Sequence, residues 1–500
     1  MFGFVEILPL RLSTGPLQVN RGALLRRGIM GCERNWFLEE KFESPRGEIR
    51  LRFEEGTLIA EGFDDGDQMG EWWAFDDRID AWRCPAFRYR RALGEMLKQG
   101  WKVEDRARRY ERCSAQIERR FRPYEHQSQG LRAWTENECR GVVVLPTGAG
   151  KSYLAVLAIA GVERQTLVVV PTIDLMTQWV GNLEEAFGGP VGMLGGGYHE
   201  VEAITVSTYD SAAIHMHRLG DRFGLVVFDE VHHLPGQIYR QASRQCIAPY
   251  RLGLTATPER ADGGHRDLDY LVGPIVYRKS IKELSGEILA DYEVRTLEVA
   301  MNEADREFYE RERGIYRGFV DDENIRLGGL RGWRRFLAAT SRSDAGRRAL
   351  KAYHAQKRMA LVHEEKLALL YELLERHAED RILIFTNDNA SVYAISEAIL
   401  CPAITHETRV KERRNILEKF RCGDYRVLVT SKVLNEGVDI PEASMAVVLA
   451  GSGSVREHVQ RLGRILRRSK GKRALLYELV TVDSVESHVS RRRREHDAYQ

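Results

Sequence analysis

The segment LPTGAGKS at 145–152 carries the residue types that bind a polyphosphate. It follows a run of residues that predicts a strand and opens a run that predicts a helix, so backbone N–H groups and the helix N-terminus would face an anion. Lys151 adds a full positive charge, and the hydroxyl of Ser152 is placed to bind Mg²⁺. Leu145 stands where the strict pattern has its first glycine, so a structural glycine-rich turn is the alternative.

The segment FDEVHH at 228–233 ends another apolar run with two carboxylates. In an enzyme that hydrolyses a nucleotide, Asp229 would hold the Mg²⁺ through water, and Glu230 would orient and deprotonate the attacking water. Two acids after a strand are often only solvated side chains. Because this pair follows a phosphate-binding segment in the same predicted sheet, nucleotide hydrolysis is the favoured interpretation.

The segment QRLGRILRR at 460–468 predicts a helix rich in cations. Arg464 and Arg467 are three residues apart and share one helix face. An arginine pair presented from a neighbouring domain would stabilise charge on a transferring phosphoryl group. A solvated basic helix face is the alternative, but Gln460 and Gly463 among the arginines favour the catalytic role. The expected catalytic residues are therefore Lys151, Asp229, Glu230, Gln460, Arg464 and Arg467.

Short β-branched runs alternate with helix-length segments from Gly141 onward, which predicts a doubly wound parallel α/β sheet. The expected strands of this series lie at 141–145, 166–170, 203–206, 224–229 and 251–255. A second series of the same kind lies at 381–385, 425–430, 444–450 and 473–480. The sequence therefore predicts two α/β lobes in one chain.

The chain is expected to have three domains. Residues 1–118 would form an accessory domain, in which 49–67 predicts paired strands and the Arg-rich segment 104–121 predicts a linking helix. Residues 119–290 would form the first lobe, which binds the nucleotide. Residues 291–500 would form the second lobe, with a charged and aromatic helical module inserted at about 300–362.

The composition is that of an ordinary globular protein, with 500 residues, 43% hydrophobic and 30% charged. The formal net charge is only +2, so affinity for nucleic acid would need local basic patches. The seven cysteines are scattered without the spacing of a metal site or a disulfide framework. The sequence has neither an apolar run long enough for a membrane span nor a convincing signal peptide. We therefore expect a cytoplasmic protein that does not bind membranes.

Four segments in this order, PTGAGKS, DEVH, LTAT at 254–257 and QRLGRILR, resemble the DExH helicases and translocases of superfamily 2. The resemblance covers about residues 122–468 and implies two RecA-like lobes that hydrolyse ATP, with Mg²⁺, in the cleft between them. It implies nucleotide-binding roles, besides those of Lys151 and Ser152, for Arg122, Gln127, Thr147, Gly148, Gly150, Gly437 and Asp439. Contacts to nucleic acid are implied for Thr172, Thr208, Asn387 and Thr430.

A narrower resemblance is to the short prokaryotic form of the XPB family of DNA repair helicases. It rests on the histidine that ends DEVH and on GSGSVREHVQRLGRILR at 451–467. The segment at 75–93 is similar to the damage-recognition domain of that family, and the insertion at about 300–362 is similar to its thumb. The family has an Arg-Glu-Asp triplet for strand opening. This chain keeps Arg260 and Asp262 as strand-opening candidates but has Ala261 between them.

The resemblance implies an ATP-dependent DNA helicase or translocase that moves 3′ to 5′ and opens or remodels DNA in a process similar to nucleotide excision repair. The expected partners are single-stranded, forked or bubble DNA and a separate nuclease, with the chain acting near the nucleoid as a monomer or heterodimer. Three alternatives stay open. They are a duplex translocase of a restriction or defence system, an RNA helicase, and a nucleotide-gated clamp that binds DNA without moving.

Overall fold

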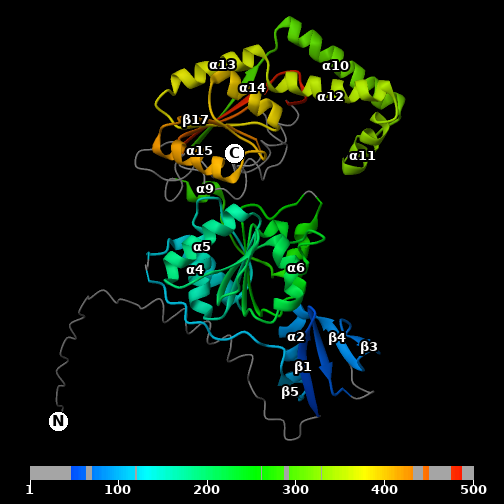
Figure 1. Cartoon of the computed structure of the whole chain (residues 1–500), viewed down its shortest axis with the longest axis vertical. Helices are drawn as coiled ribbons and strands as arrows, with labels where there is room; N and C mark the ends of the chain where they lie inside the picture. The colour runs from blue at the N-terminus through cyan, green and yellow to red at the C-terminus, as the bar shows by residue number, and fades with distance from the viewer. Residues whose placement is uncertain are drawn as a thin grey trace, which may run out of the picture.

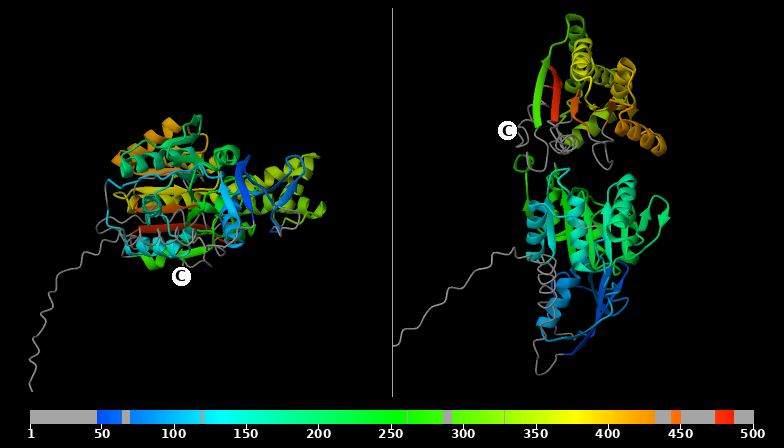
Figure 2. Two further views of the ribbon diagram at one scale, coloured as in Figure 1. Left: turned by 90° about the horizontal axis from the view of Figure 1, so that it is seen from below. Right: turned by 90° about the vertical axis from the view of Figure 1, so that its left-hand side faces the viewer.

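The computed structural model describes residues 47–63, 70–118, 121–260, 262–285, 292–327, 329–431, 443–449 and 474–486. These residues form three β-sheets with helices packed against them (Figure 1). In Figure 1 and in the right-hand view of Figure 2, the three sheets follow one another along the long axis of the molecule. The two larger sheets belong to α/β lobes, as the sequence predicts.

The N-terminal sheet has five strands in the order β3-β4-β2-β1-β5. Strand β1 (Glu48–Glu54) pairs antiparallel with β2 (Thr57–Glu61), which confirms the paired strands predicted in this region. Helix α2 (Tyr89–Lys98) packs on the sheet through the buried residues Tyr89, Ala92, Leu93 and Met96, whose spacing is that of one helix face. The remaining strands are β3 (Ala74–Asp76), β4 (Ala81–Pro85) and β5 (Lys102–Asp105).

The segment after β5 is extended along the first lobe, so the linking helix predicted at 104–121 is wrong. Its backbone N–H groups donate to carbonyl oxygens of the lobe, from Arg109 to Asp221 at 3.1 Å and from Cys113 to Glu163 at 3.1 Å. Cys113, Ala115 and Ile117 are turned inward and the residues between them are exposed, which is the period of an extended chain. These tertiary contacts override the helix propensity of the arginine and glutamate side chains.

The first lobe has an eight-stranded sheet that carries most of the predicted strands. All of its strand pairs are parallel except that of β8 with β9, and the central strands are buried on both faces, which explains their continuous apolar runs. In sheet order the strands are β13 (Ile275–Arg278), β6 (Arg140–Val144), β12 (Tyr250–Thr255), β11 (Leu225–Asp229), β7 (Thr166–Val170), β10 (Ile204–Thr208), β8 (Gly192–Gly195) and β9 (Tyr198–His199).

Helices cover both faces of this sheet (Figure 1). One face packs against α3 (Glu125–Glu136), α4 (Lys151–Val162) and α5 (Ile173–Phe187), which share a core with alternate residues of the strands. The other face packs against α6 (Tyr209–Leu219) and α7 (Gln241–Arg244). A sheet covered in this way exposes its strand ends, where loops can hold a ligand.

The second lobe has a six-stranded sheet in the order β14-β19-β18-β15-β17-β16, with every pair parallel. Its four predicted strands are confirmed as β15 (Ile382–Phe385), β17 (Val427–Thr430), β18 (Met445–Val448) and β19 (Ala474–Thr481). The two further strands are β14 (Tyr292–Val299) and β16 (Ala403–Ile404). Helices of this lobe are α13 (Glu364–Arg376), α14 (Asn389–Ile399) and α15 (Val410–Cys422).

A helical module lies between β14 and α13, in the part of the sequence where an insertion is predicted. It consists of α10 (Glu303–Asp322), α11 (Gly329–Thr340) and α12 (Asp344–Leu361). Tyr316 and Phe336 form its aromatic core, with ring centroids 5.6 Å apart. The nearly buried carboxylate of Glu312 on α10 accepts two hydrogen bonds of 2.6 Å from Arg348 on α12. The module is therefore a packed unit.

None of the helices in the described ranges is both long and apolar enough to cross a membrane. The six cysteines within these ranges are all free thiols.

We predict that Arg251→Lys destabilises the first lobe. Arg251 is 1% exposed, and its guanidinium donates to the carbonyl oxygens of Ala248, Cys246 and Leu271 at 3.0, 2.6 and 2.7 Å. Lysine cannot reach all of these acceptors, so the free energy of unfolding should fall by about 3 kcal/mol. Hydrogen exchange of the β12 amides measures the effect. Arg106→Lys, at an exposed ion pair with Glu104, is the control, and equal exchange in both variants would contradict the prediction.

Candidate functional site

The phosphate-binding segment forms a loop between β6 and α4. Gly148 and Gly150 adopt left-handed conformations, with φ of 85° and 76°. A Cβ on Gly150 would lie 2.3 Å from Nε2 of Gln127, so both backbone angle and space require glycine there. Leu145 is fully buried, and its N–H donates to the carbonyl of Thr255 at 3.0 Å. It continues the strand, which explains why this position accepts a leucine.

Two polar side chains of the loop fit a bound phosphate. The Lys151 ammonium donates to the carbonyls of Leu145 and Pro146 at 3.2 and 3.4 Å, so it lies folded over the loop. The hydroxyl of Thr147 is buried and has no hydrogen-bond partner among the described residues. An unsatisfied buried hydroxyl is costly, and phosphate oxygens would supply the missing partner.

The two carboxylates of DEVH stand at the end of β11. Asp229 is 7% exposed and accepts hydrogen bonds from the indole N–H of Trp179 at 2.8 Å and from the N–H of Glu230 at 3.0 Å. Burial, and then the adjacent charge of Glu230, raise the pKa of Asp229 to about 6, and Lys151 opposes the shift. Glu230 itself has a left-handed backbone, with φ of 46°, a strained conformation that is common at functional sites.

The residues at this edge of the sheet also fit a divalent cation. Strand β11 is separated from β6 by β12 only, so Asp229 and the loop with Ser152 lie at the same carboxyl edge. A hydroxyl and a carboxylate are the hard oxygen ligands that Mg²⁺ prefers. A cation would also offset the cost of burying Asp229 beside Glu230. The chain therefore has the residues for a nucleotide with its metal.

A hydrogen-bond network joins DEVH to the segment LTAT. The hydroxyl of Thr255 lies 3.4 Å from a carboxylate oxygen of Glu230 and 3.0 Å from Nδ1 of His232. Arg260 donates to the backbone carbonyl of His232 at 2.7 Å, and it forms a two-point ion pair with Asp262. This ion pair holds the pKa of the Asp262 carboxyl well below its usual range. The strand-opening candidates are thus tied to the carboxylate segment.

The first turn of α3 contacts the phosphate-binding loop. Gln127 is buried and donates to the carbonyl of Gly150 at 3.0 Å, while its amide oxygen accepts from the N–H of Tyr124. Its expected contact with the base stays a prediction. His126, which the sequence analysis did not single out, lies 2.7 Å from the carbonyl of Ala149 through Nε2. Arg122 is exposed ahead of the helix.

The residues expected to contact nucleic acid have different surroundings. Thr172 follows β7, and Thr208 is the last residue of the neighbouring strand β10. The two side chains cap α5 and α6, accepting from the N–H groups of Leu175 and Ser211. Helix N-termini at one edge suit phosphate groups.

In the second lobe, the two expected contacts differ from each other. Asn387 follows β15, and its side-chain oxygen is buried without a partner among the described residues. Thr430 is fully buried, and its hydroxyl donates to the carbonyl of Ile404 at 3.0 Å, so it does not face solvent as a phosphate contact would. Strand β17 lies between β15 and the short edge strand β16, which contributes to this burial.

Five expected site residues of the second lobe lie outside the described residues. They are Gly437, Asp439, Gln460, Arg464 and Arg467. Ala261 of the triplet lies outside them as well. The structure therefore brings together the first-lobe part of the expected site, and the roles of all these residues stay predictions.

Two side chains that position Asp229 had no signal of their own in the sequence. Trp179 donates to its carboxylate from 50 residues away, and the hydroxyl of Tyr209 donates to its backbone carbonyl at 3.0 Å. Trp179 lies on α5, seven residues after Thr172, for which the sequence predicts a contact with nucleic acid and not with the metal. Trp179 and Asp229 become neighbours only when α5 packs against the sheet that contains β11.

We predict that Trp179→Phe moves the acidic limb of the ATPase kcat/KM profile to higher pH. Activity that needs ionised Asp229 is lost as the pH falls through its pKa of about 6. Removing the indole donor destabilises the carboxylate, so the pKa should rise further. Trp134→Phe, which removes a buried hydrogen bond to the carbonyl of Arg251, is the control. Equal profiles in the two variants would contradict the prediction.

Models of three protein families match the chain. Residues 51–107 match the xeroderma pigmentosum group B helicase damage recognition domain. Residues 120–260 match the type III restriction enzyme, res subunit, and residues 365–469 match the helicase conserved C-terminal domain. The three matches follow the order of the three sheets.

Curated relatives match over most of the chain. The DNA 3'-5' translocase XPB2 of Sulfurisphaera tokodaii is 39% identical over 89% of this chain and 100% of its own length. The DNA 3'-5' helicase XPB of Mycobacterium tuberculosis is 29% identical over 71% of this chain and 60% of its own length. The XPB/SSL2 subunit of transcription and DNA repair factor IIH of Saccharomyces cerevisiae is 27% identical over 75% of this chain and 43% of its own length.

Solved structures share the fold. Dbp5 of S. cerevisiae, bound to RNA and ADP BeF3, superimposes with a TM-score of 0.53 over 76% of this chain and 88% of its own, at 17% identity. At that identity the likeness concerns the arrangement of the lobes alone. The family follows from sequence, because 39% identity extends over the whole of the translocase relative. The chain belongs to the XPB family of superfamily 2 helicases.

Proposed function

We propose that this chain is an ATP-dependent DNA motor that moves 3′ to 5′ and opens or remodels DNA during repair. The observation that carries the proposal is the common sheet edge at which Lys151, the unpartnered Thr147 hydroxyl and the carboxylates of Asp229 and Glu230 meet. The direction and the DNA substrate are supported by the names of the relatives, which are DNA 3'-5' translocases and helicases.

ATP with Mg²⁺ is the proposed cofactor. Bound Mg²⁺ would neutralise charge on the β- and γ-phosphates. Lys151 would leave the carbonyls of Leu145 and Pro146 and turn to the phosphates, while the Thr147 hydroxyl would gain a partner. Glu230 would orient the attacking water and accept its proton. From the second lobe, Gln460, Arg464 and Arg467 would complete the site, with the arginines stabilising charge in the transition state.

The network around Thr255 supports a route from hydrolysis to DNA. Glu230 and His232 both lie within 3.4 Å of the Thr255 hydroxyl, and the carbonyl of His232 accepts from Arg260. A change in the protonation or position of Glu230 at hydrolysis would alter these contacts. The ion pair of Arg260 with Asp262 would then carry the change to the surface, where 60% of the Asp262 side chain is exposed.

A second candidate is translocation along duplex DNA without separation of the strands. Ala261 removes the middle carboxylate of the family triplet, and this observation favours the second candidate. The relative that matches over its whole length is itself named a translocase. The ATP site and the direction of movement are the same in both candidates, so an assay of strand separation distinguishes them.

The proposal includes a location and a partner. A DNA motor of this family would act beside the nucleoid in the cytoplasm, as a monomer or with a separate nuclease. Co-elution of the purified chain with a candidate nuclease tests the partner, and consistent separate elution would reject it.

Steady-state ATPase activity tests the motor. We predict stimulation by single-stranded or bubble DNA and a loss of at least about 100-fold in Glu230→Gln, because the water loses its general base. Glu259→Gln, at an exposed ion pair with Arg278, makes the same change of charge in the same lobe and should retain activity. No turnover with any DNA, or stimulation by RNA alone, would reject the DNA motor.

Strand displacement tests the second candidate. If translocation occurs without separation, wild-type protein should displace a third strand from a triplex but should not unwind a forked duplex. Ala261→Glu restores the family triplet and should raise the unwinding rate several-fold while leaving triplex displacement unchanged. Efficient unwinding by the wild type would favour the helicase and remove the role assigned to Ala261.

A further inference from the structure

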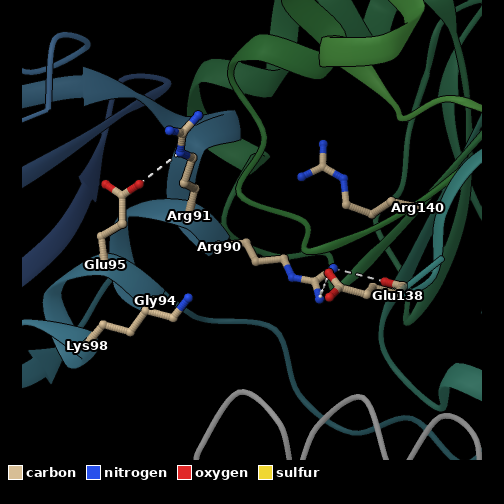
Figure 3. Close-up of a pocket in the computed structure, with 7 residues that line it drawn as sticks. All are labelled: Arg90, Arg91, Gly94, Glu95, Lys98, Glu138 and Arg140. Atoms are coloured by element: carbon tan, nitrogen blue, oxygen red, sulfur yellow. Dashed lines mark hydrogen bonds and ion pairs between the residues drawn. The ribbon is translucent and has the colours of Figure 1, made fainter. Parts of the chain in front are cut away.

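A pocket of about 400 Å³ lies where the N-terminal domain meets the first lobe (Figure 3). It is lined from α2 by Arg90, Arg91, Gly94, Glu95 and Lys98, and from the first lobe by Glu138 and Arg140. Arg140 begins β6, while the phosphate loop follows the last residue of that strand. At about 3.3 Å per residue, the length of β6 separates this pocket from the nucleotide site by roughly 16 Å. The pocket is therefore a separate feature of the lobe.

The charges of the pocket are unequal. Two of its four cations are paired, Arg91 with Glu95 at 2.9 Å and Arg90 with Glu138 at 2.6 Å. Lys98 and Arg140 form no ion pair within the described residues, although the charge of Glu138 is felt at Arg140, and Figure 3 shows Arg140 extending from the first lobe toward α2. Two unpaired cations beside two paired ones attract an anion.

Arg140 is held in place although its charge is largely removed from water. Its Nε donates to the carbonyl of Val272 at 3.2 Å, which leaves the end of the guanidinium for a ligand. Burial, and then the neighbouring Arg251, Arg90 and Arg88, lower the pKa of Arg140 to about 9, so it stays a cation at neutral pH. A bound anion would remove much of this repulsion.

The lining indicates which part of a nucleic acid the pocket would take. The seven described residues of the lining include no aromatic side chain on which a base could stack, and guanidinium and ammonium groups recognise phosphate. Gly94 adds no side chain, and a Cβ there would meet only open space, so the surface of α2 is accessible at its centre. A phosphate could approach the helix closely at this point.

We propose that this pocket binds a backbone phosphate of duplex DNA outside the inter-lobe cleft. The inference rests on the proposed DNA motor, which supplies the ligand. Duplex DNA fits better than a single strand because it is stiff over about 150 base pairs, so a duplex held at the lobes would extend beyond them in a straight line. The contact would anchor duplex of any sequence, because phosphate contacts carry no base information.

The test measures binding of the full chain to a short blunt duplex by fluorescence anisotropy at several salt concentrations. Lys98→Gln and Arg140→Gln should each weaken binding about three- to tenfold and reduce the slope of log K against log salt by about 1. Gly94→Gln should also weaken binding, because the glutamine side chain fills the pocket without a change of charge. Glutamine has a higher helix propensity than glycine, so this variant should not destabilise α2. Lys102→Gln removes a cation of the same domain outside the pocket and should bind as the wild type.

Wild-type affinity in the Lys98 and Gly94 variants would overturn the proposal, and neither variant removes a hydrogen bond of the fold. A titration with tripolyphosphate forms a second arm. If tripolyphosphate binds through Lys98 while duplex affinity stays unchanged, the pocket takes a free anion and the DNA assignment is wrong. If the pocket variants lost affinity for single-stranded RNA but not for duplex DNA, the proposal would also be overturned. Basal ATPase activity and its stimulation by DNA, measured in the same preparations, test the motor separately.

Discussion

Strands β6, β12 and β11 run side by side and parallel, and each ends in residues of the candidate site. The phosphate loop follows β6, Thr255 ends β12, and Asp229 ends β11. Because side chains alternate between the faces of a sheet, a shift of one residue in either pair would turn Asp229 or Thr255 away from the loop. Burial of these strands in the core of the lobe, from Val142 to Val144 on β6 and along β11 and β12, determines that register.

The same burial determines the electrostatics of the site. Asp229 is removed from water beside a second carboxylate, and its charge is retained by directed donors from Trp179 and from the backbone of Glu230. Hydrogen bonds are stronger in such surroundings, and unpaired groups are more costly. The buried hydroxyl of Thr147 is such an unpaired group among the described residues, and a bound phosphate would supply its missing hydrogen-bond partner. The cost of burying these polar groups therefore raises the free energy of the site, and ligand binding would recover part of that cost.

Much of this fold could be predicted from sequence, because both lobes rest on buried parallel strands with continuous apolar runs. The run at 166–170 coincides with β7, and each end of the other predicted strands lies within two residues of the observed end. The extended segment after β5 could not be predicted, because its partners, such as Asp221 and Glu163, are distant in sequence. Trp179 was missed for the same reason. Motif spacing located Asp229 and Lys151, but it could not show that Thr430 is buried on β17, beside β16.

The two accessory modules are attached to different lobes. The N-terminal domain is joined to the first lobe by the extended segment and by Ile247, which lies in its core. The helical module is joined to the second lobe, where the hydroxyl of Thr481 donates to the carbonyl of Ala360 on α12 at 2.6 Å and the hydroxyl of Tyr309 on α10 accepts from the N–H of Val485. An ion pair of 2.8 Å between Asp174 and Arg413 connects the lobes. A rotation that moves one lobe toward or away from the other therefore changes the separation of the two modules. A pair of fluorescent labels, one on each module, would report such movements during the nucleotide cycle as a change in distance.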